Sequence, residues 1–237
     1  QSRSSAASDV YKRQVRIIFG CDEESGFEDL KYYLNHEKAP IAGFTPDCKY
    51  PVVYAERGRA VIKVKADLDH LITFMNKYIL NTQNKGERLG IDYKNEEFGQ
   101  LEIRNYHLTK EDFSFSISYP AGLTLEEILD QLNRIEGYEY EVVSHFKPVY
   151  FDKKAPMVEI MKETYEYVTG NDGTPVTTTG GTYAKMMPHI VPFGPSFPGQ
   201  KGIGHNPNEW MTREDLITNA KIYALTLYQL SRKETEL

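Results

Sequence analysis

Three stretches of the chain alternate hydrophobic and polar residues, as strands do when one face packs on a core and the other meets solvent. They are residues 59–65, 113–119 and 138–146. Residues 67–80 and 124–135 repeat their hydrophobic positions with helical spacing and separate these strands. The order strand, helix, strand, helix, strand predicts a small open α+β sandwich, which we place at residues 59–154.

The segments on either side follow another pattern. VRIIF, residues 15–19, is continuously apolar and is followed by Gly20. Such a run is typical of a strand buried on both faces of a parallel sheet. The fold class predicted is α/β: part of a parallel-sheet catalytic domain, built from residues 15–58 and 155–237 and interrupted by the inserted α+β domain.

Three helices are predicted in these outer segments from their caps. Ser25 and Glu28 have the spacing of a capping box, which predicts a helix over residues 26–36. Gly170 is expected to end a helix that begins near residue 155, and Thr212 is expected to cap the last helix. Residues 1–14 lack apolar periodicity and are interpreted as a non-native leader.

The composition narrows the class of protein. The chain has 237 residues, 40% of them hydrophobic, and a net charge of −6 without a block of Lys or Arg, which argues against a nucleic-acid partner. No segment approaches the roughly 20 apolar residues that a membrane helix needs. Cys21 and Cys48 are too few for a disulfide framework and are interpreted as packing residues. We therefore predict a cytoplasmic protein with no membrane partner.

Candidate chemistry lies at three places. Asp22, Glu23 and Glu24 follow the VRIIF run, where parallel α/β sheets build their sites, although acids before a helix can also serve its dipole. Asp47 in FTPDC is either a turn residue or a metal ligand. His205 in GHNPNE is either solvated or a ligand. Together they supply the donor types of a hydrolytic zinc site.

The order of these motifs resembles the PepV-type dipeptidases, often described as Xaa-His dipeptidases, of the aminoacylase/carboxypeptidase-like clan of zinc peptidases. The resemblance rests on DEES, FTPD, GGTYAK, FPG, GHNPNEWM and IYALTLYQL, and it runs in order from Val15 onward. It implies zinc-dependent hydrolysis of dipeptides by a metal-activated water. The inserted α+β domain then corresponds to the family's lid.

The resemblance also implies roles for individual residues. Glu23 matches the general base, Glu24 and His205 match ligands of one zinc ion, and Asp47 matches a ligand of the second. The metal expected is Zn²⁺, two per complete site, with Mn²⁺ or Co²⁺ as substitutes. Gly181, Thr182 and Asn208 lie in the matching C-terminal motifs and are expected to bind the dipeptide.

Two departures from the family pattern carry expectations of their own. The family's upstream H-x-D element and bridging Asp have no counterpart before Val15, so we interpret the chain as the C-terminal portion of such an enzyme and expect it to be inactive by itself. The lid is expected to be shortened near residues 65–67. Apolar faces around VRIIF and the last helix are expected to be exposed and to promote association.

Other functions remain open at this point. An amino-acid deacylase or desuccinylase of the same clan would use the same site on an acylated substrate. A non-catalytic peptide-binding module would use the lid and the Gly-rich loop without metal. A lid-mediated scaffold would need residues 59–65 as an exposed sheet edge.

Overall fold

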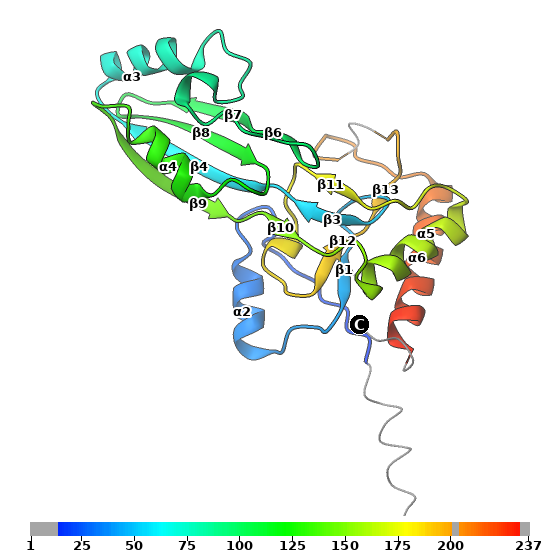
Figure 1. Ribbon diagram of the computed structural model, residues 1–237. Coiled ribbons are helices and arrows are strands. Elements are labelled where there is room, and N and C mark those ends of the chain that lie inside the picture. The colour runs from blue at the N-terminus through cyan, green and yellow to red at the C-terminus, as the bar shows by residue number, and fades with distance from the viewer. Residues whose placement is uncertain (1–13, 201–203, 233–237) are drawn as a thin grey trace, which may run out of the picture. The chain divides into compact units, whose positions relative to one another are not determined.

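The computed structural model describes residues 14–200 and 204–232. They form two compact units, shown in Figure 1. The first takes its residues from the ranges 1–54, 151–176 and 182–237, and the second consists of residues 55–150 and 177–181. Within the described ranges, no helix combines the length and the apolar character needed to cross a bilayer.

The second unit is built on a four-stranded antiparallel sheet in the order β7-β8-β4-β9. These strands are β4 (Gly58–Lys65), β7 (Glu102–Leu108), β8 (Asp112–Tyr119) and β9 (Glu139–Phe146). The alternation in β4 is as predicted: Ala60, Ile62 and Val64 are buried, while the residues between them keep exposed surface. The strand β7 escaped prediction because all but one of its residues are exposed or polar, as befits an edge strand.

Two helices cover one face of this sheet (Figure 1). They are α3 (Leu68–Phe74), which continues as a π-helical turn over Met75–Ile79, and α4 (Leu125–Leu132). Asp67 caps α3, and Thr124 with Glu127 forms a capping box on α4. The predicted helices of this unit are thus confirmed.

Residues 59–65 do not form a sheet edge. The strand β4 lies between β8 and β9 and hydrogen-bonds to both. The expectation of an exposed edge, on which the scaffold function rested, is therefore wrong. The half-exposed alternation was correctly attributed to a strand, but one face of a central strand can also meet solvent.

The remaining elements of the second unit are short. They are a 3₁₀ turn over Glu87–Leu89, the hairpin of β5 (Lys94–Asn95) and β6 (Gly99–Gln100), and β10 (Val149–Tyr150). The strand β10 pairs antiparallel with β3 (Val53–Glu56), and the sheet order there is β10-β3-β11, with β11 at Val176–Thr178.

The first unit combines helices with short parallel strand pairs. Its helices are α2 (Glu28–His36), α5 (Pro156–Thr169) and α6 (Arg213–Ser231), with a 3₁₀ turn over Tyr183–Lys185. The strand β1 (Gly43–Thr45) runs parallel to β12 (Ile190–Pro192), and β2 (Cys48–Lys49) runs parallel to β13 (Pro195–Ser196). The chain therefore has an α/β fold with both parallel and antiparallel pairing.

Helices α5 and α6 lie side by side and hold the core of this unit (Figure 1). Tyr50, Tyr165 and Phe193 are fully buried there, with Tyr50 stacked on Tyr165 at 5.1 Å between ring centroids. Gly170 ends α5 in the left-handed conformation with φ 71°, and the Thr212 side chain caps α6, both as predicted.

The VRIIF segment is the main correction to the predicted fold. Residues 14–20 form no strand, and Val15, Ile17 and Phe19 are 51%, 71% and 93% exposed. An apolar run becomes a buried strand only where neighbouring strands supply hydrogen bonds, and no described segment pairs with this one. The predicted exposure of apolar side chains here is confirmed, and so is that on α6, where Leu216 is 61% exposed.

Candidate active site

The acidic loop after VRIIF is folded by its own backbone. The carbonyl oxygen of Asp22 accepts hydrogen bonds from the amides of Ser25, Gly26 and Phe27 at 3.3, 3.3 and 3.0 Å. The side chain of Asp22 accepts one from the amide of Glu28 at 2.8 Å. Asp22 therefore starts α2, because its carboxylate accepts from the first amide of the helix and lies at the positive end of the helix dipole.

The predicted capping box is therefore wrong. Phe27, with φ 66°, stands at the N-cap and makes no side-chain capping bond, and Glu28 forms an ion pair with Lys31 instead. The spacing of Ser25 and Glu28 suits a capping box, but the tight turn at residues 22–27 places the helix start two residues later than this spacing requires.

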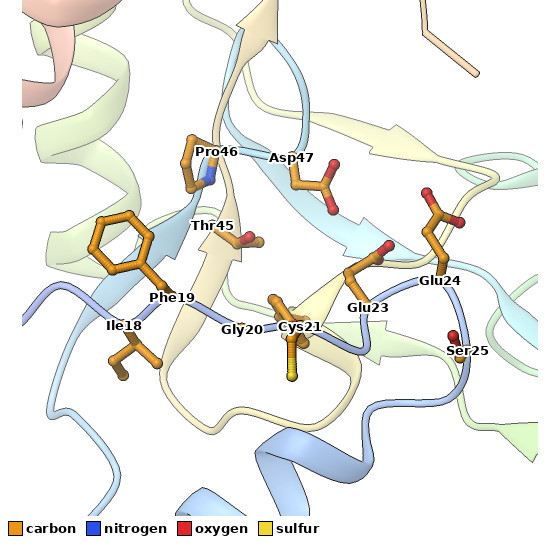
Figure 2. Close-up of a pocket in the computed structure, with 11 residues that line it drawn as sticks. Ile18, Phe19, Gly20, Cys21, Glu23, Glu24, Ser25, Thr45, Pro46 and Asp47 are labelled. Carbon is orange, nitrogen blue, oxygen red and sulfur yellow. The ribbon is translucent and has the colours of Figure 1, made fainter. Parts of the chain in front are cut away.

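The loop forms one wall of a pocket of about 480 Å³. Figure 2 shows the side chains of Glu23, Glu24 and Asp47 on one side of it and those of Ile18 and Phe19 on the other. Glu23 and Glu24 come from the turn before α2, whereas Asp47 comes from the connection between β1 and β2. Three of the four predicted catalytic and metal-binding residues therefore line one pocket.

The carboxyl groups in this pocket affect one another. Loss of hydration raises the pKa of Asp47, although the residue as a whole keeps exposed surface, and the negative charge of Glu24 raises it further. A hydrogen bond from Glu23 and the proximity of His205 act in the opposite direction. The net effect is a raised pKa for Asp47.

His205 is the fourth predicted residue, and its ring lies next to Glu24. Its Nε2 atom is 3.2 Å from Oε1 of Glu24, and the two side chains are 80% and 72% exposed. Two ligands of one tetrahedral zinc ion stand about 3.3 Å apart, because each lies roughly 2.0–2.2 Å from the metal. In residue type and separation, this pair fits a shared zinc ion.

The pair does not by itself make a complete metal centre. Among the residues that the structure describes, no three His, Cys, Asp or Glu side chains are grouped so that they could hold a metal ion. A structural zinc site has four ligands, and a catalytic one has three from the protein. Glu24 and His205 alone could therefore supply only part of such a ligand set.

The three residues expected to bind the dipeptide do not line this pocket. Thr182 is 3% exposed, and its hydroxyl accepts a hydrogen bond from the amide of Ala184 at 3.2 Å. Asn208 is exposed and has φ 61°, and Gly181 is exposed in the second unit. Their role in binding stays a prediction.

Sequence reasoning missed Asp29 on α2 and Tyr183 at the pocket. Tyr183 lines it, and the Tyr183 hydroxyl donates a hydrogen bond of 2.6 Å to Asp29 on α2. Burial and this hydrogen bond raise the pKa of Tyr183 to about 12. Burial alone would raise the pKa of Asp29, but the hydrogen bonds that Asp29 accepts from Tyr183 and the loop amides outweigh it and lower that pKa. The only sequence signal was that Tyr183 belongs to the Gly-rich GGTYAK motif.

Cys21 also differs from its expectation. It is exposed and lines the pocket, so its interpretation as a packing residue is wrong. Cys48 is half-buried in β2, and neither cysteine is in a disulfide.

Comparison with known proteins identifies the family. Residues 4–229 match the sequence profile of peptidase family M20/M25/M40. This chain therefore belongs to that family of peptidases.

Several curated relatives are described as putative dipeptidases. The chain is 22% identical to "Putative dipeptidase YtjP" of Bacillus subtilis (strain 168), over 93% of this chain and 70% of the relative. It is 27% identical to a protein of Staphylococcus aureus (strain USA300) with the same description, over 94% of this chain and 71% of the relative. The latter alignment spans 334 residues, more than the 237 of this chain, so the relative contains residues within that span that this chain lacks.

Solved structures share the fold. The di-peptidase Dug1p of Saccharomyces cerevisiae superposes with a TM-score of 0.61 at 13% identity, covering 91% of this chain and 65% of that one. Aminopeptidase PepT of Bacillus cereus superposes with a TM-score of 0.60 at 17% identity, covering 89% and 63%. This chain thus spans less than two thirds of the length of either structure. The similarity confirms the predicted α/β class.

Proposed function

We propose that this chain serves in the zinc-dependent hydrolysis of dipeptides, as a dipeptidase of the PepV type. The observation that carries the proposal is the grouping of Glu23, Glu24 and Asp47 around one pocket, with His205 3.2 Å from Glu24, in a chain of a peptidase family. The description of the bacterial relatives as dipeptidases favours dipeptides over acylated amino acids.

Glu23 is the general base in this proposal. Its side chain lines the same pocket as Glu24 and Asp47. In hydrolysis it takes a proton from the attacking water and passes it to the nitrogen of the leaving amine. Such a base must lie within hydrogen-bonding reach of the water, and its place in the pocket wall supports that role.

The remaining acids and the histidine would hold the metal. Glu24 and His205 would bind one zinc ion and Asp47 the other, with Mn²⁺ or Co²⁺ as substitutes. Bound zinc supplies Lewis-acid polarisation of the peptide carbonyl and lowers the pKa of water. Since no group of three donors exists in the part of the chain that is described, we propose that the ligand set is incomplete and that the chain alone is inactive.

The finer features of the proposal rest on the resemblance. From the resemblance we propose that Gly181, Thr182 and Asn208 contact the dipeptide. We also propose that Xaa-His dipeptides are the preferred substrates and that the protein is cytoplasmic.

A zinc titration tests the metal part of the proposal. Calorimetry on the purified chain should detect one weak site that is lost in His205→Ala and kept in His107→Ala, which removes an exposed histidine of the second unit. Two tight sites would contradict the incomplete ligand set. No binding at all would contradict the roles of Glu24 and His205.

Ligand binding separates the candidate functions. The zinc-loaded chain is titrated with the dipeptide Ala-His and with N-succinyl-alanine. Tighter binding of the dipeptide supports the dipeptidase, and tighter binding of the acylated amino acid supports the deacylase. Equal dipeptide affinity with and without zinc would favour a metal-free peptide-binding module. Should the chain turn over dipeptides, Glu23→Gln should slow hydrolysis by about 10²–10⁴-fold.

A further inference from the structure

Asp29 lies behind the acidic loop and accepts hydrogen bonds from four different residues. Its Oδ2 atom accepts from the amides of Cys21 at 2.7 Å and Asp22 at 3.1 Å, and from the Tyr183 hydroxyl at 2.6 Å. Its Oδ1 atom accepts from the amide of Leu30 at 2.8 Å. One carboxylate thus joins the pocket loop, its own helix and a tyrosine 154 residues further along the chain.

These bonds hold the backbone directly before the general base. Cys21 and Asp22 immediately precede Glu23 and Glu24, and Asp22 organises the turn that carries both glutamates. With the amides of residues 21 and 22 bonded to Asp29, the backbone at the start of the turn cannot rotate without losing two hydrogen bonds to a charged acceptor. The backbone at residues 21 and 22 therefore sets the direction in which the side chains of Glu23 and Glu24 leave the chain.

Tyr183, which also lines the pocket, completes the arrangement. Its hydroxyl is held by Asp29, and its ring contacts Phe27 at 5.6 Å between centroids. Gly20 leaves room for the hydrogen bond between Tyr183 and Asp29, because a Cβ atom at position 20 would lie 1.9 Å from the Tyr183 hydroxyl. The glycine therefore allows the hydroxyl to approach the backbone at the loop entrance.

We propose that Asp29, with Tyr183 as its partner, is a positioning residue that aligns Glu23 and Glu24 for metal binding and proton transfer. The proposal rests on the proposed function of the pocket and adds a residue that does not touch the reacting atoms. A carboxylate is required at this position because both of its oxygens act as acceptors, and an amide has only one acceptor oxygen.

The experiment compares Asp29→Asn and Tyr183→Phe with Glu28→Gln in the full chain. Glu28→Gln makes the same chemical change one residue away, on a side chain that is 70% exposed and pairs with Lys31. Amide hydrogen exchange is followed at Cys21 and Asp22, and zinc affinity is measured by calorimetry.

We expect exchange at Cys21 and Asp22 to accelerate at least tenfold in Asp29→Asn, and less in Tyr183→Phe, which removes one donor and leaves the carboxylate in place. Zinc affinity should fall at least tenfold in Asp29→Asn and stay unchanged in Glu28→Gln. Unchanged amide exchange in α5 and α6 would show that the first unit stays folded. Tyr183→Phe gives a second test if Asp29→Asn fails to fold.

The outcomes separate this proposal from the function of the pocket. Zinc binding by the native chain that is equally tight in Asp29→Asn would overturn the positioning role and leave the metal ligands standing. Unchanged exchange at Cys21 and Asp22 in Asp29→Asn would overturn it as well. Failure of the native chain to bind zinc would contradict the metal ligands, while faster exchange in Asp29→Asn would still support control of the loop by Asp29.

Discussion

The hydrophobic cores of the two units consist of different kinds of side chains and elements. In the second unit a regular sheet packs its apolar face, which includes Ile62 and Phe115, against two helices. In the first unit aromatic rings, among them Tyr50 and Tyr165, fill the space between helices and two-residue or three-residue strands. The pocket lies in the first unit, where loops are held by side-chain hydrogen bonds to the backbone.

The residues that determine the stability of the protein therefore differ from those that shape the pocket. A sheet with continuous backbone pairing tolerates the loss of single polar contacts, because its stability is distributed over many buried side chains. A loop that is held by a few hydrogen bonds depends on each of them. Variants in the two units should therefore differ both in the size of their effects and in which property they change.

The largest effect is expected from the sheet core. Phe115 is fully buried in β8, and Phe115→Ala should lower the free energy of unfolding by about 3–5 kcal/mol through lost burial and a cavity. Urea unfolding followed by circular dichroism measures this loss. Phe115→Leu is the control and should cost less than about 1.5 kcal/mol. A loss below about 1 kcal/mol in Phe115→Ala would mean that this core is loosely packed.

A smaller loss is expected in the aromatic core. Tyr50 donates a hydrogen bond of 2.6 Å to Oδ1 of the buried Asn219. Tyr50→Phe leaves that oxygen without this donor and should cost about 1–3 kcal/mol in unfolding free energy. Tyr167→Phe removes a hydroxyl from a residue that is 83% exposed and should be neutral. Equal effects in the two variants would contradict a structural role for the Tyr50 bond.

At the pocket, Gly20→Ala should change function more than stability. The added methyl group would crowd Tyr183 and the Asp29 carboxylate and disturb their hydrogen bond, at a cost of about 1 kcal/mol because the crowded atoms lie at the ends of these two side chains. Faster exchange at the Cys21 and Asp22 amides is the expected readout. Gly180→Ala is the control, since its nearest neighbour would lie at an ordinary 3.9 Å. Slow exchange in Gly20→Ala would show that the loop does not need Tyr183.

The smallest effect is a dependence on pH. The pKa of Tyr183 is raised from 10.0 to about 12, so the folded chain holds this proton more tightly than the unfolded chain. The stabilisation is complete below pH 10 and is lost as the pH rises through about 12. Melting temperatures of the native chain and Tyr183→Phe should therefore converge over this range. A constant difference from pH 8 to 12 would contradict the shift.

Local patterns in the sequence were sufficient for most of the regular structure. Alternation in β4, β8 and β9 and the caps Gly170 and Thr212 identified their elements, because each depends on residues a few positions apart. The strand β7 was missed, since an edge strand with polar residues on both faces lacks that alternation. The acids and the histidine of the candidate site were proposed from their motifs, and their roles stay predictions.

Only the tertiary structure decided what depends on distant partners. The hydrophobicity of VRIIF could not tell whether a neighbouring strand would cover it, and the segment is exposed. The capping box expected at Ser25 and Glu28 does not form, because a tight turn around Asp22 places the helix start later. The contact of Asp29 with Tyr183 joins residues 154 positions apart. Side chains so far apart in sequence meet only through the packing of the whole unit, so no local pattern encodes their meeting.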